Sequence, residues 1–139
     1  MLCSHGRARF GPHLRRLQSG EDAHVLSLRM VQGDVQRVAE AIAVALDVDV
    51  EITDRDLIRV AGTGEFSRQL GNSLAGQGRV HAHVLQTGAT IVIENPGDHE
   101  LCRTCVMAKR CYATAELCCP INHGDAVAGV VGLVSHTQA

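Results

Sequence analysis

The chain has 139 residues, which is the size of one domain with a single hydrophobic core. Apolar residues make up 45% of it, but there is no Trp, one Tyr and two Phe. The core is therefore expected to be aliphatic, and stacking of nucleic-acid bases on aromatic side chains is not expected. A formal net charge of -2 gives no general affinity for polyanions, so we expect no direct contact with nucleic acid.

The sequence has no run of roughly 18 apolar residues that would cross a membrane. Its N-terminus also lacks the continuous apolar segment of a secretory signal. We therefore predict a cytoplasmic protein with no membrane partner. In a reducing compartment, clustered thiols are more often metal ligands or redox groups than structural disulfides.

Two regions are distinguished along the chain. Residues 1–30 have mixed polarity and weak periodicity, and we predict a poorly ordered or arm-like segment there. Residues 31–139 are predicted to form the folded domain. In this domain, apolar residues recur at helical spacing from Asp34, a candidate helix cap, to Leu46, which predicts an amphipathic helix.

After this helix, the sequence predicts strands from alternating apolar and polar residues, and turns from Gly, Pro, Asn and Asp residues between them. Residues 48–53 predict a strand, a turn follows at 54–56, and a second strand returns over 57–61. A loop with a helical turn is expected after this hairpin, and a short helix that ends at Gly88 follows it. Further strands are predicted over residues 89–94, 115–121 and 126–135.

This order of elements indicates an α+β fold. We predict an antiparallel sheet of about five strands with helices packed on one face, which is the pattern of PAS- and GAF-like sensory domains. The cysteine-bearing loop lies at residues 99–119 of this domain, where it joins the predicted third strand to the fourth.

Five of the six cysteines lie within 18 residues. Cys102 and Cys105 form a C-x2-C pair, Cys111 follows, and Cys118 and Cys119 are adjacent. This spacing lets several thiolates converge on one centre, and four thiolates are what an iron–sulfur cluster or a structural zinc requires. We predict an iron–sulfur cluster, most simply of the 4Fe–4S type, with zinc or a metal-free thiol switch as alternatives.

The fourth ligand of this site is ambiguous. Adjacent strand residues point to opposite faces, so only one of the vicinal cysteines can reach the metal that the loop cysteines bind. Cys119 is preferred because it precedes Pro120, as the last cysteine of bacterial ferredoxin loops does, and Cys118 is the alternative. His99 is a reserve ligand. The predicted ligand set is Cys102, Cys105, Cys111 and Cys119.

Four segments carry a family resemblance: VAEAIAVALDVDVEITDRDLIRVAGTG, GRVHAHVLQTG, IENPGDHELCRTC and AELCCPINHGDAVAGVVGLV. Over residues 34–135, they resemble the N-terminal sensory domain of sigma-54-dependent transcriptional regulators. The resemblance implies a PAS- or GAF-like fold, signal reception and a homodimer. It also implies AAA+ ATPase and DNA-binding domains as partners, in cis or in trans. The sequence has no G-x4-G-K-S/T motif and no helix-turn-helix, so an excised or free-standing sensor is expected.

Two sensing mechanisms follow from these features. The preferred one is detection of redox state, oxygen or nitric oxide by the iron–sulfur cluster. The alternative is a small-molecule module with a structural zinc or thiol switch, whose pocket would be lined by Arg59, His81 and His83. An enzyme is not expected, because the sequence has no nucleophile elbow, H-E-x-x-H motif or phosphate loop.

Overall fold

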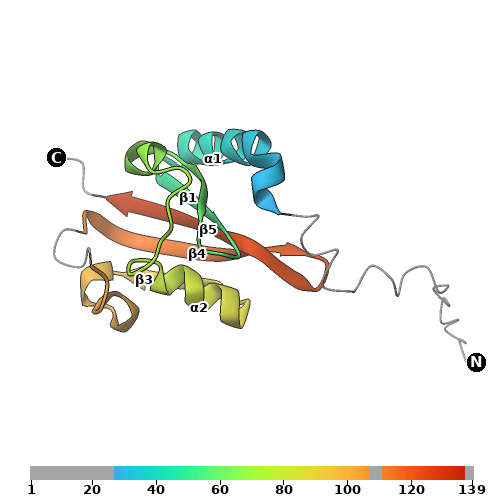
Figure 1. Ribbon diagram of the computed structural model, residues 1–139. Helices are drawn as coiled ribbons and strands as arrows, with labels where there is room; N and C mark the ends of the chain where they lie inside the picture. The colour runs from blue at the N-terminus through green and yellow to red at the C-terminus, as the bar shows by residue number, and fades with distance from the viewer. Residues whose placement is uncertain (1–26, 107–110, 137–139) are drawn as a thin grey trace, which may run out of the picture.

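A computed structural model of the protein describes residues 27–106 and 111–136. These residues form a five-stranded antiparallel sheet in the order β2-β1-β5-β4-β3 (Figure 1). The strands are β1 (Asp49–Asp54), β2 (Arg59–Gly62), β3 (Ile91–Glu94), β4 (Ala113–His123) and β5 (Ala126–His136). The helices are α1 (Gln32–Leu46) and α2 (Arg79–Thr87), with 3₁₀ helices η3 (Leu28–Val31), η4 (Gly64–Arg68), η5 (Pro96–Asp98) and η6 (Glu100–Cys102). The predicted α+β class and antiparallel sheet are confirmed.

Helix α1 forms where it was predicted, but only part of the predicted apolar stripe is buried, since Val38 is 54% exposed and Leu46 is 58% exposed. Ala39 is fully buried among Val50 and Ile52 of β1, and the helix ends at a left-handed residue, Asp47. The helix begins before the predicted cap, so Asp34 lies within the first turn and forms an ion pair with Arg37. No helix in the described part of the chain is long and apolar enough to cross a membrane.

The β1–β2 hairpin is anchored by its turn. The carboxylate of Asp54 accepts hydrogen bonds from the backbone N–H groups of Asp56 at 2.9 Å and Ile58 at 3.0 Å. Arg29 of η3 pairs with both Asp54 and Asp56, which ties this short helix to the hairpin. Most of the arm predicted over residues 1–30 lies outside the described residues, and that prediction remains untested.

The two helices cover opposite faces of the sheet, and the prediction that they pack on one face is wrong (Figure 1). Val50 and Ile52 of β1 face α1, whereas Thr53 of β1 contacts His81 of α2. The alternation in β1 suggested one buried face and one solvated face. In the folded protein β1 is buried on both faces, because Glu51 and Thr53 lie beneath the α2 side.

Each face of the sheet has its own hydrophobic cluster. The cluster under α1 is aliphatic and surrounds Ala39, Val50 and Ile52. The cluster under α2 has as its buried members Val80, Val84, Ile93, Cys102, Cys118 and Val130. This second face therefore brings two cysteines from the predicted metal-binding region into the core, next to the helix that carries His81.

Candidate ligand and metal site

A cavity of about 320 Å³ lies on the α2 side of the sheet. Strands β1, β2, β4 and β5 contribute to its wall, together with α2, the η4 region and the cysteine-bearing loop. Many of its polar lining groups come from residues far apart in the sequence, among them Glu51, Arg59, Gln77, His81 and Glu116. Its size falls in the range of roughly 300–1,000 Å³ that small-molecule sites occupy.

A buried ion pair forms one wall of the cavity. Arg59 Nη2 and Nε donate to Glu51 Oε1 at 2.6 Å and 3.0 Å, and Nη1 donates to the carbonyl oxygen of Gln69 at 3.3 Å. The guanidinium also lies over the ring of Phe66, with 5.5 Å between Cζ and the ring centroid. These contacts hold the guanidinium in one orientation, so its planar edge is a fixed element of the cavity wall.

His81 forms part of the floor of the cavity. The helical turn that buries Val80 and Val84 against the sheet also directs His81 inward, and its residue exposure is only 2%. Its Nδ1 lies 2.8 Å from the hydroxyl oxygen of Thr53. Its Nε2 is buried and has no hydrogen-bond partner among the described residues. A buried ring nitrogen without a partner is costly, so Nε2 is a candidate for binding a ligand that the cavity admits.

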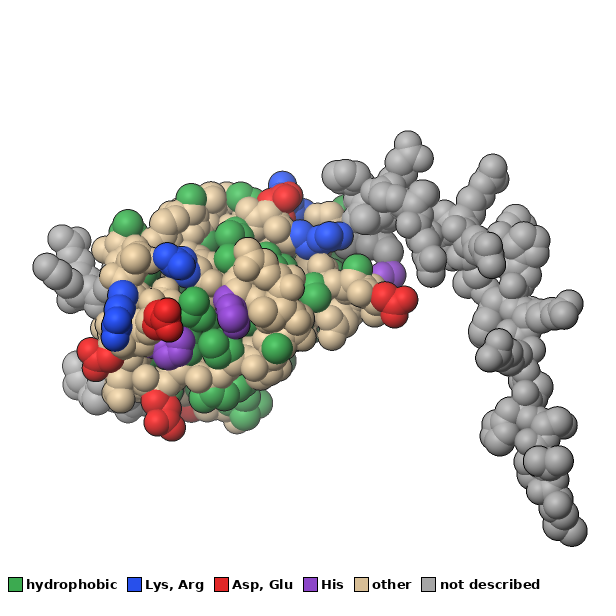
Figure 2. Space-filling view, turned by 90° about the horizontal axis from the view of Figure 1, so that it is seen from below, with side chains coloured by type: hydrophobic (Ala, Val, Ile, Leu, Met, Phe, Trp, Pro, Cys, Tyr) green, Lys and Arg blue, Asp and Glu red, His purple; other side chains and the backbone are tan. Residues whose placement is uncertain are grey.

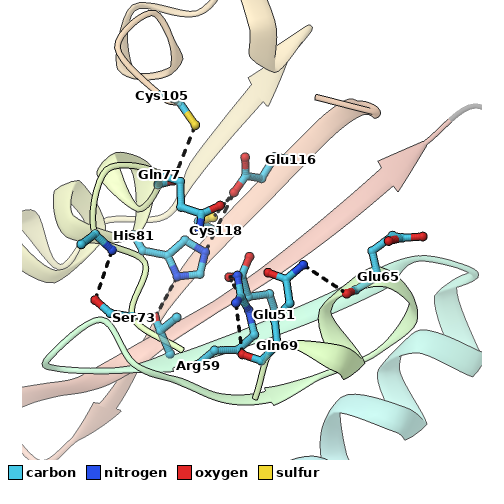
Figure 3. Close-up of polar contacts among 12 residues, drawn as sticks. Glu51, Arg59, Glu65, Gln69, Ser73, Gln77, His81, Cys105, Glu116 and Cys118 are labelled. Atoms are coloured by element: carbon cyan, nitrogen blue, oxygen red, sulfur yellow. Dashed lines mark hydrogen bonds and ion pairs between the residues drawn. The ribbon is translucent and has the colours of Figure 1, made fainter. Parts of the chain in front are cut away.

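Glu116 and Cys118 of β4 meet His81 from the sheet. The two residues are separated by one position in the strand, so their side chains share a face. The Cys118 thiol donates to Glu116 Oε1 at 3.1 Å, and that oxygen lies 4.0 Å from His81 Nε2 (Figure 3). One ligand atom from each of His81, Glu116 and Cys118 lies within 4.8 Å of the others. Burial, followed by the negative charge of Glu116, raises the pKa of the Cys118 thiol.

The cysteine-bearing loop forms the opposite wall. His99, the reserve ligand of the sequence prediction, instead caps η6, because its Nδ1 accepts from the backbone N–H of Leu101 at 3.1 Å. Cys102 ends η6 and is buried, Cys105 follows it, and Cys111 is exposed. All three cysteines line the cavity. The C-x2-C pair and Cys111 therefore line the same cavity, but their thiols do not form a group of three within 4.8 Å of one another among the described residues.

The protonation of Cys102 depends on this location. Burial, with further contributions from the charges of Glu116, Cys111 and Cys105, raises the pKa of Cys102 to about 11. Cys102 is consequently a neutral thiol at neutral pH unless a metal displaces its proton.

The predicted fourth ligand, Cys119, does not face the cavity. In the β4–β5 register Cys118 pairs with Gly132, on the cavity face, and Cys119 pairs with Val131, which packs on the α1 side. Cys119 therefore lies on the face of the sheet opposite to the loop cysteines, and the alternative, Cys118, lies on theirs. Side-chain alternation along the strand, and not the following Pro120, decides which of the two cysteines points inward.

Sequence reasoning located part of this site. Of the three pocket residues it named, Arg59 and His81 line the cavity and His83 does not. It did not identify Glu116. The signal that was available is the spacing of Glu116 and Cys118 in a strand, which places a carboxylate and a thiol on one face. Nothing in the sequence shows that this face lies beneath His81.

The surface on the α2 side carries no segregated charge. Acidic, basic, histidine and hydrophobic side chains are intermixed on this face (Figure 2).

No protein-family model matches the chain. A curated relative does: UacR of Escherichia coli strain K12, named as a uric acid sigma-54-dependent transcriptional regulator, is 36% identical over 111 residues. The match covers 80% of this chain but only 19% of the length of UacR. It confirms the resemblance to sigma-54-dependent regulators that the sequence segments indicated.

Solved structures with a similar arrangement of elements include GAF domains. The A. aeolicus nlh2 GAF domain in an inactive state has a TM-score of 0.59 at 18% identity, covering 78% of this chain and 70% of its own. The GAF domain of Acinetobacter phosphoenolpyruvate-protein phosphotransferase has a TM-score of 0.61 at 21% identity, covering 88% and 75%. The type II free methionine-R-sulfoxide reductase of Thermoplasma acidophilum has a TM-score of 0.59 at 13% identity, covering 78% and 77%. At these identities the likeness establishes the GAF fold and neither a shared ligand nor a shared activity.

Proposed function

We propose that this chain is the signal-sensing GAF domain of a sigma-54-dependent transcriptional regulator and that its signal is a small molecule bound in the α2-side cavity. The observation that carries the proposal is the cavity itself, about 320 Å³ in volume, with buried polar groups in its wall. The Glu51–Arg59 pair and Nε2 of His81 are both present there. Buried polar groups of this kind fix the orientation of a ligand and provide specificity.

The chemical class that we propose for the signal is a urate-like oxidised purine. Such a molecule is planar, with alternating carbonyl acceptors and N–H donors along its edges. Arg59 and Gln77 supply donors for the carbonyl groups, and Glu116 supplies an acceptor for an N–H group. Support for this class also comes from UacR, whose name carries uric acid.

The proposed output is regulatory. AAA+ ATPase and DNA-binding domains, in cis or in trans, would receive the signal in a cytoplasmic homodimer. Because the wall of the cavity includes the η4 region and the cysteine-bearing loop, a ligand that contacts both would favour the conformation in which both are closed. In this account the domain has no catalytic role.

Titration of the purified protein with urate in a calorimeter tests the proposal. Gln77→Ala removes an exposed glutamine that lines the cavity, and Gln86→Ala removes one on α2 that does not. We expect the wild type to bind urate and Gln77→Ala to bind it roughly fivefold more weakly, as the loss of a single hydrogen bond implies. Gln86→Ala should bind like the wild type. If urate, xanthine and hypoxanthine all fail to bind the wild type, the proposed ligand class is incorrect.

A second candidate function is the sensing of redox state, oxygen or nitric oxide through an iron–sulfur cluster. The observation that favours it is that Cys102, Cys105 and Cys111 line one cavity, while Cys118 lies in the same buried cluster as Cys102. These four residues would hold the cluster, which would supply one-electron chemistry when bound. Neutral thiols must then lose their protons, so assembly of the cluster would be coupled to proton release.

Iron and acid-labile sulfide analysis after anaerobic purification tests this second candidate. Stoichiometric iron and sulfide with a broad visible absorption would support it. We expect Cys102→Ser to lose them and Cys119→Ser, the matched control on the opposite face, to keep them. A colourless wild-type protein without iron would exclude the cluster.

A further inference from the structure

We propose that His81, Glu116 and Cys118 form a mononuclear zinc site at the floor of the cavity, with one coordination position open toward the cavity. This inference goes beyond the proposed sensory function, because zinc binding at these residues does not depend on the identity of the signal or on the regulator's other domains.

The donor set suits zinc. Imidazole nitrogen, carboxylate oxygen and thiolate sulfur are the three kinds of protein ligand that zinc takes. The three candidate ligand atoms lie within 4.8 Å of one another, and the residues come from α2 and β4, two regular elements packed on each other. When Cys118 binds as a thiolate, its charge and that of Glu116 balance the two positive charges of the ion. The buried site then carries no net charge, which limits the cost of desolvation.

The orientation of His81 is an independent observation that points to a ligand. Its Nδ1 lies 2.8 Å from Oγ1 of Thr53, so an Nδ1–H donor fits this contact and leaves the lone pair of Nε2 free. Nε2 lies 4.0 Å from Glu116 Oε1 and has no hydrogen-bond partner among the residues that the structure describes. A metal-binding histidine almost always donates its other ring N–H to a second group, which fixes both tautomer and ring orientation. In this protein the second group is the hydroxyl oxygen of Thr53.

The space next to the site is kept open by a glycine. Gly132 of β5 is paired with Cys118, and a Cβ atom at this position would lie 2.9 Å from His81 Nε2 and 3.5 Å from Cys118 Sγ. A side chain at residue 132 would therefore intrude between the imidazole and the thiol. The glycine is explained by the need to bring both ligand atoms together over the central strand.

Three protein ligands leave the site incomplete for a tetrahedral ion. Zinc sites with an open coordination position have three protein ligands, with water or a small molecule in the fourth position. His81 and Glu116 both line the cavity, so the open position faces the space where a ligand would lie. Water or an anionic heteroatom of the ligand would complete the coordination. Cys102, which packs in the same cluster as Cys118, is the competing fourth ligand from the protein.

Cobalt and zinc titrations of the metal-free, reduced protein under anaerobic conditions test the site. We expect one cobalt ion to bind per chain and to give a near-ultraviolet thiolate-to-cobalt charge-transfer band. Zinc should displace the cobalt stoichiometrically. Cys118→Ser should abolish the band, and His81→Gln and Glu116→Gln should each weaken zinc binding at least tenfold. Thr53→Val should weaken it by about 10- to 100-fold, the range expected when the partner of a ligating histidine is lost.

Matched controls separate this site from the loop. Cys119 and His83 are close in sequence to the proposed ligands Cys118 and His81, but neither lines the cavity. Cys119→Ser and His83→Gln should therefore both retain wild-type affinity for zinc. Glu116→Gln replaces a partly exposed residue, and its melting temperature in the absence of metal shows whether lost binding reflects lost folding. Absence of cobalt and zinc binding by the folded wild type would overturn the proposal. So would a charge-transfer band that survives in Cys118→Ser and disappears in a Cys102→Ser/Cys105→Ser variant. Urate titration of the chelator-treated protein tests the sensory proposal separately.

Discussion

A Cβ atom on Gly132 would lie 2.9 Å from Nε2 of His81, although one residue is on the central strand β5 and the other on helix α2. The sheet backbone and the imidazole are therefore in direct contact at the floor of the cavity. This contact gives His81 a single position, with Thr53 on one ring nitrogen and the cavity on the other.

Substitution of this glycine should damage the metal site more than the fold. We predict that Gly132→Ala displaces the imidazole and weakens zinc binding at least tenfold, as measured by competition with a chromophoric chelator. Gly33→Ala is the control, because Gly33 lies in α1 with no atom near its missing Cβ. It should stabilise the helix by up to about 1 kcal/mol and leave zinc affinity unchanged. Equal zinc affinity in the two variants would contradict the prediction.

The hydrophobic cluster beneath α2 should be essential for stability. Ile93 is fully buried in that cluster, and Val92, its neighbour in β3, is 62% exposed. We predict that Ile93→Ala lowers the free energy of unfolding by about 2–5 kcal/mol. Val92→Ala should change it by less than about 0.5 kcal/mol. Urea denaturation followed by circular dichroism measures both, and comparable losses in the two variants would show that β3 is not packed as described.

Removal of one partner of the Glu51–Arg59 pair should lower the free energy of unfolding much more than replacement of both partners by apolar residues. Arg59→Met leaves a buried carboxylate without its partner, and we predict a loss of about 3–5 kcal/mol in the free energy of unfolding. The double variant Glu51→Leu/Arg59→Met removes both charges and should recover most of that loss, although it removes polar ligand contacts. Chemical denaturation of the wild type, Arg59→Met and the double variant measures the three free energies of unfolding. A double variant no more stable than Arg59→Met would show that the pair itself stabilises the fold.

Cys102 should make the metal-free fold sensitive to alkali. Burial raises the pKa of its thiol to about 11, from an ordinary value of 9.0, so the folded state holds the proton more tightly than the unfolded state. This contribution to stability is complete below about pH 9 and is lost as the pH rises to about 11. Cys102→Ala should therefore lose less stability than the wild type over this interval, and Cys111→Ala, at an exposed position, should behave like the wild type. Unfolding free energies measured across the interval test this, and identical slopes for all three proteins would refute it.

The sequence predicted most elements because local signals and tertiary packing agreed. The helical spacing in α1, the extended segment of β1 and the glycine that ends α2 all correspond to elements of the fold. The arrangement of helices was not predictable in this way. Glu51 and Thr53 are polar, so β1 resembled a strand with one solvated face, but Arg59 and His81 satisfy these side chains in the interior.

The candidate site was only partly accessible to sequence reasoning. Cysteine spacing identified the loop, and strand alternation predicted that Cys118 and Cys119 lie on opposite faces, but it did not show which of them faces the cavity. The contact of His81 with Glu116 was not accessible, because it depends on how α2 crosses the sheet. A histidine in an amphipathic helix gives no local sign that one of its ring nitrogens is buried without a hydrogen-bond partner.

The most direct test of the central claim, that the α2-side cavity receives the signal, is amide NMR of the isotope-labelled protein during a urate titration. We predict saturable shifts at residues lining the cavity, such as Glu51, Gln77 and Glu116, with little change along α1. Shifts confined to α1, or a spectrum that urate leaves unchanged, would contradict it.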